Sequence, residues 1–308
     1  MKNSLRFATQ ELRLVPFFHS LSGNQVSNLY SHMFREDVAL GIMPIGGRSR
    51  RCPDFSAEMV GIDSDLGIDL INSISRSKRG GFKQALCDSI NALVTDLLWS
   101  GSSTYEIYYR DGSPNLMHIT QNRTVRLPWV TVQVVPRADR EQWKKSYSLC
   151  SNSRIWYLSM PKSLGGRSGY MKTIKILNSI SSGAIPEFAR ANIGAVVGRP
   201  GFNVVEFDML QSIAINKAAK MWGWNRRDTS ETKQTEYYQI YKMARFRFAQ
   251  ALLREHLVSE LNKLFVKLGF KCDLSVSGLP TSDGILTVLN DLEVGGVPFN
   301  CVFEKTSC

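Results

Sequence analysis

Residues 228–269 limit what this chain of 308 residues can fold into. The stretch contains no proline and no internal glycine, and its apolar residues recur every three or four positions, as on one face of a helix. Asp228 and Glu231 have the spacing of a capping box, and Gly269 suits the left-handed position after a last turn. A helix of this length would measure about 57 Å, which exceeds what a domain of this size needs. We expect it to cross its subunit, to bend near residues 245–247, or to pack against copies of itself; one long or broken core helix is the alternative.

Apolar and aromatic residues also lie off the main stripe of this predicted helix. A second apolar face is unusual for a helix in a monomer, and it is expected where a subunit is packed on both sides. We therefore expect the helix to bury area between subunits. The candidate inter-subunit residues are Tyr237, Tyr241, Phe246 and Leu253.

The remaining segments predict a helix-rich α+β fold, in which helices alternate with short strands. Residues 1–50 are interrupted by Pro16 and Pro44 and are predicted to be a helix-poor basic lead-in, and the last residues a peripheral tail. The predicted helices cover residues 63–78, 82–100, 171–181, 207–222 and a short segment capped by Ser282. The predicted strands are a hairpin at 104–119 that turns at Asp111 and Gly112, segments 124–136 and 154–160, and a short strand after Gly269.

The positive charge is concentrated in one segment. Lys and Arg exceed Asp and Glu by 38 to 27, which gives a net charge of +11. Residues 123–175 contain eleven bases but only two acids, Asp139 and Glu141, with tryptophans and tyrosines among them. Bases for phosphates and rings for stacking are what a nucleic-acid surface needs. A solvated β-rich subdomain with its own aromatic core, or a face for an acidic protein, would explain the same pattern.

Several classes of chemistry lack support in the sequence. The six cysteines form no CxxC pair, which indicates free thiols in a reducing compartment. No apolar run approaches the length of a membrane span, and no signal peptide is recognised. The four histidines lack metal-ligand spacing, and no nucleophile elbow occurs. Asp63, Asp65 and Asp69 fit the first turns of a helix, and Glu106 is predicted to pair with an arginine across strands. We expect no metal, no cofactor and no enzyme activity.

Three patterns, in order along the chain, resemble bacteriophage portal proteins. The first is LLWSG followed by STYEIYYRDGSPNLMHI, which resembles a portal helix, a small-residue turn and a strand hairpin. The second is RIWYLSMPKSLGGRSGY, which resembles the strand and glycine turn before the middle helices. The third is TEYYQIYKMARFRFAQALLREHLVSELNKLFVKLGF, followed by VSGLPTSDGILTVLNDLEVGGVPFN, which resembles the long helix, short strand and final helix. The resemblance covers residues 60–300, and the chain is short for the family.

The resemblance implies a dodecameric homo-oligomeric ring at one capsid vertex, through which double-stranded DNA is packaged and ejected. Its partners would be the terminase, the major capsid protein and neck or adaptor proteins, in the virion and, during assembly, in the host cytoplasm. The candidate contacts with DNA or with the motor and adaptor are Arg137, Arg140, Lys144, Lys145, Arg154 and Arg167. The candidate channel-loop residues are Arg199, Arg226 and Arg227.

The resemblance also implies a division into five segments. Residues 1–60 would be a basic N-terminal arm, 61–122 a wing-like helix and hairpin, and 123–182 a basic β-rich stem or clip region. Residues 183–270 would hold a channel-proximal loop and the long helices, and 271–308 a strand, a small helix and a tail. A channel through which DNA slides should not bind it tightly, because each neutralised phosphate adds salt-dependent affinity. The basic segment would then face a protein. A viral nucleic-acid-binding protein that forms no ring and uses residues 123–175 is the alternative function.

Overall fold

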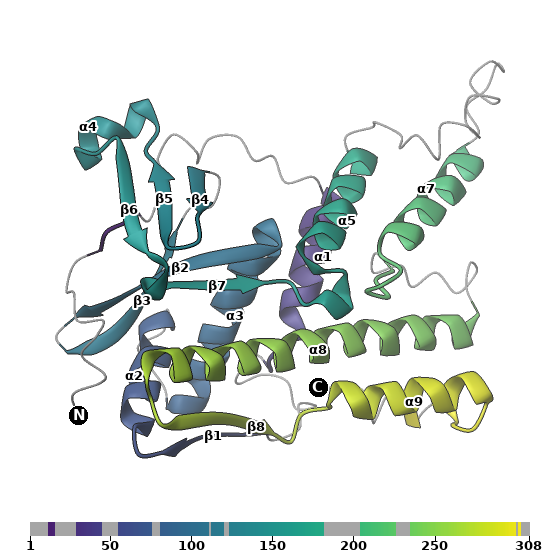
Figure 1. Ribbon diagram of the computed structural model, residues 1–308. Coiled ribbons are helices and arrows are strands. Elements are labelled where there is room, and N and C mark those ends of the chain that lie inside the picture. The colour runs from purple at the N-terminus through teal and green to yellow at the C-terminus, as the bar shows by residue number, and fades with distance from the viewer. Residues whose placement is uncertain are drawn as a thin grey trace.

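The computed structural model describes residues 12–15, 29–44, 55–75, 81–110, 112–119, 123–181, 204–225, 235–299 and 301–302, and these form a helix-rich α+β fold (Figure 1). The helices are α1 (Leu29–Leu40), α2 (Ser64–Ile74), α3 (Phe82–Ser100), α4 (Arg140–Trp143), α5 (Gly166–Ser181), α7 (Val204–Ala218), α8 (Glu236–Leu268) and α9 (Ser282–Val294). The strands are β1 (Ser56–Gly61), β2 (Ser102–Arg110), β3 (Ser113–Ile119), β4 (Thr124–Arg126), β5 (Val130–Val134), β6 (Tyr147–Ser151), β7 (Ile155–Ser159) and β8 (Cys272–Ser277).

Helix α8 confirms the prediction of one long helix. It begins after Thr235, whose side chain accepts a hydrogen bond from the backbone N–H of Tyr238. It ends at Gly269, which has a φ of 80° and donates to the carbonyls of Phe265 and Val266. The capping box predicted at residues 228–231 lies outside the described residues. The helix is continuous through residues 245–247, and the bend expected there is not seen (Figure 1).

Both faces of α8 are covered by the chain itself. Its C-terminal half contributes Leu253, Leu257 and Leu261 to the main core, together with residues of α3 and β8. Its N-terminal half contributes Ile240 and Ala244 to a second core with α9. With the exception of Tyr237, the candidate inter-subunit residues therefore do not require a neighbouring subunit to cover them. The sequence could not reveal this, because it does not say which segment folds back onto the helix.

The prediction of a helix-poor lead-in is wrong for residues 29–40, which form α1. Phe34 of this helix is fully buried, and the centroid of its ring lies 5.3 Å from the ring centroids of both Trp222 and Trp224. The helix lies between the two prolines in the sequence. The tail is also less peripheral than expected, because Val302 is fully buried in the core between α8 and α9.

In the described part of the chain, three small antiparallel sheets complete the fold, in the orders β1-β8, β3-β2-β7 and β4-β5-β6. The predicted hairpin is confirmed as β2 and β3, which turn at Gly112 with a φ of 81°. The predicted strand at 124–136 is two strands, β4 and β5, while β1 and β6 were not predicted. Strand β1 near the N-terminus pairs with β8 near the C-terminus, and β7 joins the sheet of the hairpin. The sheets thus connect segments that the five-part division separates.

Two expectations concern the whole chain. No helix in the described ranges combines the length and the apolar character needed to span a membrane. Among the described cysteines, Cys150, Cys272 and Cys301 are free thiols.

Candidate interaction surface

The basic segment folds into a lobe that projects from the body of the molecule. We define this lobe as residues 123–151, which contain β4, β5, β6 and α4 (Figure 1). Its three strands pair only with one another among the described strands, in the order β4-β5-β6. The lobe is therefore held to the body by side chains and connecting segments, and not by a shared sheet.

The face of this sheet that lies against the body is polar. Thr131, Gln133 and Ser148 are buried there, beside the thiol-bearing Cys150. The Gln133 side chain accepts from the Val15 N–H at 2.7 Å and donates to the Val15 carbonyl at 2.8 Å. Gln133 thus satisfies both the N–H and the carbonyl of Val15, a residue that belongs to no sheet. Burial of the Gln133 amide is tolerated because both its oxygen and its nitrogen are hydrogen-bonded.

Glu106 of β2 holds the same N-terminal segment from the side of the body. Its carboxylate accepts from the backbone N–H groups of Arg13 and Leu14 at 2.8 and 2.7 Å. It also accepts from Nη2 of Arg154 at 2.8 Å, in a buried ion pair. The predicted pairing of Glu106 with an arginine is confirmed, although Arg154 lies in the turn before β7 rather than on a strand. Residues 12–15 are thereby fixed between the lobe and the body.

The opposite face of the lobe sheet is apolar and open to solvent. Val125, Val132 and Leu149 stand side by side across the three strands, and Val134 stands beside Tyr147. Leu149 is 52% exposed, and Trp129, in the turn between β4 and β5, is 86% exposed. We call these six residues the outer face. A sheet normally buries its apolar face and shows its polar face to water, so this lobe has the reverse arrangement. An exposed apolar patch rimmed by polar residues marks an interaction site.

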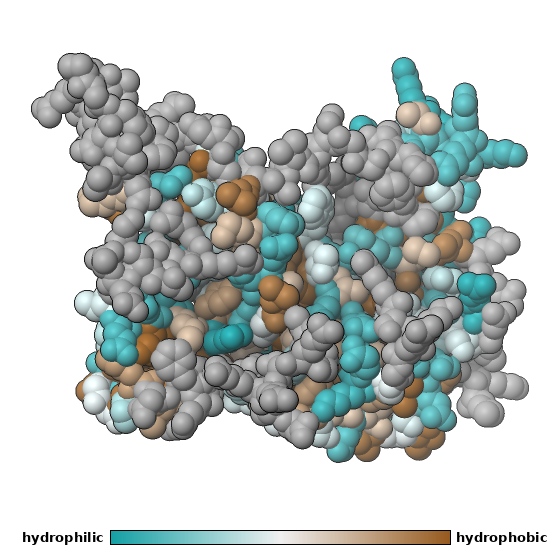
Figure 2. Space-filling model, turned by 180° about the vertical axis from the view of Figure 1, so that it is seen from behind, coloured by the Kyte–Doolittle hydropathy of each residue, from teal (hydrophilic) through white to brown (hydrophobic). Residues whose placement is uncertain are grey.

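Bases lie around the tip of the lobe. Arg137, Lys144 and Lys145 are exposed, at or next to α4. Arg140 is half-buried, and its Nε donates to the Val135 carbonyl at 3.2 Å. Figure 2 shows hydrophilic side chains gathered over this tip, at the upper right of the view.

The other two candidate contacts lie elsewhere. Arg154 is buried in its pair with Glu106, so its charge is used inside the chain and it has little surface to offer DNA or a motor protein. Arg167 is exposed in the first turn of α5, on the body. The candidate channel-loop residues Arg199, Arg226 and Arg227 lie outside the described residues.

The four candidate inter-subunit residues of α8 differ in their surroundings. Leu253 is enclosed in the chain's own core, Phe246 packs against that core, and Tyr241 packs against the core between α8 and α9. Tyr237 is 39% exposed, and its ring stacks on Tyr241 with the ring centroids 6.3 Å apart. Only Tyr237 of these four presents a large part of its side chain to solvent.

A segment of opposite charge lies at the other end of the molecule. Residues 272–299, which include β8 and α9, contain four acids and no base, while the lobe carries six bases and two acids. Their net charges are therefore −4 and +4. The acids are Asp273, Asp283, Asp291 and Glu293. Exposed apolar side chains, Leu286 and Val294, accompany them on α9. Figure 1 shows the lobe and α9 at opposite corners of the molecule.

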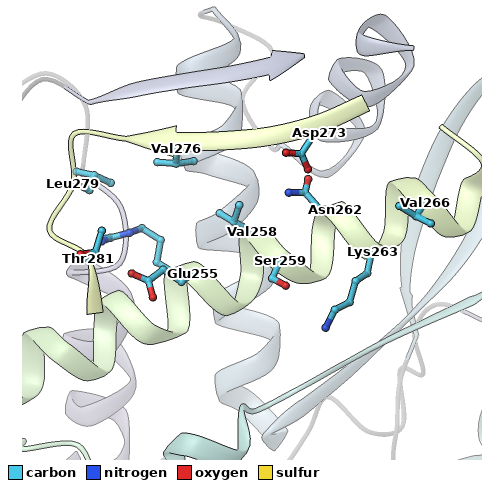
Figure 3. Close-up of a pocket in the computed structure, with 11 residues that line it drawn as sticks. Glu255, Val258, Ser259, Asn262, Lys263, Val266, Asp273, Val276, Leu279 and Thr281 are labelled. Atoms are coloured by element: carbon cyan, nitrogen blue, oxygen red, sulfur yellow. The ribbon is translucent and has the colours of Figure 1, made fainter. Parts of the chain in front are cut away.

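A groove of about 580 Å³ runs between α8, β8 and the segment before α9 (Figure 3). Its polar side chains hold these elements together. Glu255 accepts from the backbone N–H of Ser282 at 2.7 Å at the start of α9. Asn262 donates to the Leu274 carbonyl at 3.0 Å and accepts from the Leu274 N–H at 2.8 Å. Lys263 pairs with Glu260 at 2.7 Å. Glu255 also accepts from the Ser282 hydroxyl, so these polar groups have partners within the chain.

The outer face was missed in the sequence because β5 reads V-T-V-Q-V, in which the valines would be expected to face the core. The signal available was Gln133, since a glutamine can hydrogen-bond to both groups of a peptide unit. No group of three or more His, Cys, Asp or Glu residues in the described part of the chain is arranged to hold a metal ion. No protein-family model matches the chain, and no curated protein matches it closely enough to be counted as a relative.

Proposed function

We propose that the chain is the subunit of a portal ring, through which double-stranded viral DNA is packaged and ejected at one capsid vertex. The ring would be dodecameric and would dock the terminase, the major capsid protein and neck or adaptor proteins. The order of sequence patterns that resembles portal proteins supports this proposal. So does the helix-rich α+β fold with its 33-residue helix α8.

The outer face of the lobe carries the proposal. Five of its six residues are aliphatic or tryptophan, which favours a protein surface over phosphates as the partner. The surrounding net charge of +4 fits the net charge of −4 on residues 272–299 of a second copy. Because these two surfaces differ and lie at opposite ends of the subunit, their contact would be head-to-tail. Head-to-tail contacts generate rings when the rotation closes.

Mass measurement of the purified protein tests the assembly. We expect a particle close to twelve times the subunit mass of 34.7 kDa, and a ring with a central channel in negative-stain images. Replacing Leu149 with Asp should dissociate the particle, because it places a charge within the outer face. The control is Ile62→Asp, which introduces the same charge at a side chain that is 87% exposed in the turn after β1. Ile62→Asp should leave the mass unchanged.

Two results would contradict the proposal. A wild-type protein that is monomeric at all accessible concentrations would exclude ring assembly by this chain alone. An assembled particle that survives Leu149→Asp would show that the outer face is not the subunit contact. Circular dichroism on both variants establishes that each is folded.

The alternative function is a nucleic-acid-binding protein that forms no ring. The exposed bases at the tip of the lobe, Arg137, Lys144 and Lys145, favour it, because sequence-independent binding depends on such residues. A monomer that binds oligonucleotides, with affinity that falls steeply as salt rises, would support this function instead of the portal.

A further inference from the structure

A second cavity lies where the lobe meets the body. Its volume is about 380 Å³, within the usual range for small-molecule sites. Three sheet strands of the lobe and body, β2, β5 and β7, supply a floor of buried residues, and β4 and α5 supply the two arginines. The residues that line it are Thr104, Thr124, Arg126, Thr131, Ile155, Tyr157 and Arg167.

The cavity has an excess of positive charge. Arg126 and Arg167 line it, and no carboxylate is among the described residues that do so. Lys267 of α8 reaches the same region, where its Nζ donates to the backbone carbonyls of Ile155 and Asn152. The pKa of Lys267 is lowered by burial and, secondly, by the positive charge of Arg126, so the two cations lie close enough to repel each other. An anion in the cavity would relieve this repulsion.

The nearest carboxylate along β2 does not neutralise these cations. Glu106 lies two residues beyond Thr104, on the same face of the strand. Its charge is balanced by Arg154, and its oxygens accept hydrogen bonds from Arg154, Arg13 and Leu14. The cavity is therefore surrounded by three positive charges, those of Arg126, Arg167 and Lys267. No carboxylate among the described residues that line it balances them.

The shape and lining indicate what kind of anion fits. Arginines bind phosphate oxygens with two parallel hydrogen bonds, and this preference favours a phosphate over a single point charge. The volume exceeds what a bare phosphate needs, and Ile155 and the ring of Tyr157 offer an apolar wall for an organic group. The Arg126 guanidinium lies over the Tyr157 ring, 5.8 Å from its centroid, so the cation and the apolar wall are adjacent.

We propose that this cavity binds a nucleotide, with the phosphate between Arg126 and Arg167 and the nucleoside against Tyr157 and Ile155. This site does not depend on the portal proposal, since it lies between the lobe and the body of one chain. No chemical step is assigned to it. The ligand chemistry is that of a phosphate monoester carried on a nucleoside.

Isothermal titration with four probes tests the site: adenosine monophosphate, inorganic phosphate, adenosine and a hexathymidylate strand. We expect adenosine monophosphate to bind the wild-type protein, inorganic phosphate to bind more weakly, and adenosine not to bind. Arg126→Gln and Arg167→Gln should each weaken monophosphate binding about tenfold or more, since each removes charge-assisted hydrogen bonds. The matched controls are Arg137→Gln and Lys144→Gln, which remove the same charge at the tip of the lobe and should not alter it.

Four outcomes would overturn the proposal. The first is that adenosine monophosphate does not bind, and the second is that the control variants weaken its binding as much as Arg126→Gln and Arg167→Gln do. The third is that inorganic phosphate binds as tightly as the monophosphate, and the fourth is that only the hexathymidylate strand binds. The second would indicate a general electrostatic effect, and the last would indicate a surface for polymers. Because Arg126 and Arg167 are exposed, all four variants should fold, and thermal denaturation establishes this.

Discussion

At the scale of single residues, the ion pair of Glu106 shows what sequence reasoning can and cannot reach. A carboxylate between tyrosines on a strand predicts an arginine partner, and Arg154 is that partner. The same arginine was grouped with surface contacts, because a count of charges along a segment does not distinguish a buried base from an exposed one. The roles of Arg13 and Leu14 were beyond prediction, since they contribute backbone N–H groups, which every residue except proline has.

The environment of the Cys150 thiol predicts how the free energy of unfolding changes with pH. Burial, with a further contribution from the charge of Glu106, raises the pKa of Cys150 to about 12. A thiol whose pKa is raised in the folded state stabilises the fold fully below the unfolded pKa, near 8.5. That contribution is lost as pH rises from there towards 12, because the unfolded chain then releases the proton first.

We therefore expect Cys150→Ala to lose less stability than the wild-type protein between pH 8 and pH 10, as measured by urea unfolding. The difference in slope can reach about 1.4 kcal/mol per pH unit, the value for one proton. Identical slopes for Cys150→Ala and the wild type would contradict the prediction.

At the scale of elements, periodicity predicted the long helix, the β2–β3 hairpin and α9, because each has its own local pattern and end signals. Strand β1 escaped prediction because its partner is β8, more than 200 residues further along the chain. The exposure of the apolar face of the lobe sheet was not predicted, for a related reason. Thr131 and Gln133 are the buried residues of β5 because Gln133 hydrogen-bonds to Val15. Val15 lies 118 positions away in the sequence.

Two glycines near α8 predict different responses to the same substitution. Gly269 and Gly223 both have left-handed backbones, with φ values of 80° and 71°. A Cβ added at Gly269 would meet no atom within 4 Å, whereas at Gly223 it would lie 2.7 Å from Cβ of Arg245 and 2.8 Å from the Lys242 carbonyl oxygen. Gly269→Ala should therefore lower the free energy of unfolding by about 1 kcal/mol, from backbone strain alone.

Gly223→Ala should lower the free energy of unfolding by about 3 kcal/mol or more, because overpacking adds to the strain. Urea denaturation of both variants measures the difference. Equal losses would show that the chain relaxes at Gly223 and that the close approach to α8 is not rigid.

At the scale of the whole molecule, the opposite net charges of the lobe and of residues 272–299 lead to a prediction about assembly. If the lobe of one subunit meets residues 272–299 of the next, reversing charge on either surface should weaken the particle, and reversing both should restore it. The lobe variant is Lys144→Glu with Lys145→Glu, and the α9 variant is Asp291→Lys with Glu293→Lys. Lysines suit the last turns of α9, since they complement the helix dipole.

Mass photometry of the two variants and of their combination in one chain measures the effect. We expect smaller species for each variant alone and the wild-type mass for the combination. If the lobe variant alone assembles normally, the lobe charge serves a different partner. In that case packaging assays with the same variant separate terminase docking from DNA passage.

The hydrogen bonds that Glu106 and Gln133 make to residues 12–15 have a consequence for the order in which the protein can fold during synthesis. This segment is made before Glu106 and Gln133, which hold it and which follow 92 and 118 residues later. At translation rates of about 5–20 residues per second, the segment waits on the order of ten seconds for its second holder. Residues 12–15 thus reach their final contacts only after Gln133 has been made. The seam between lobe and body, with the cavity beside it, closes only after most of the two sheets has been made.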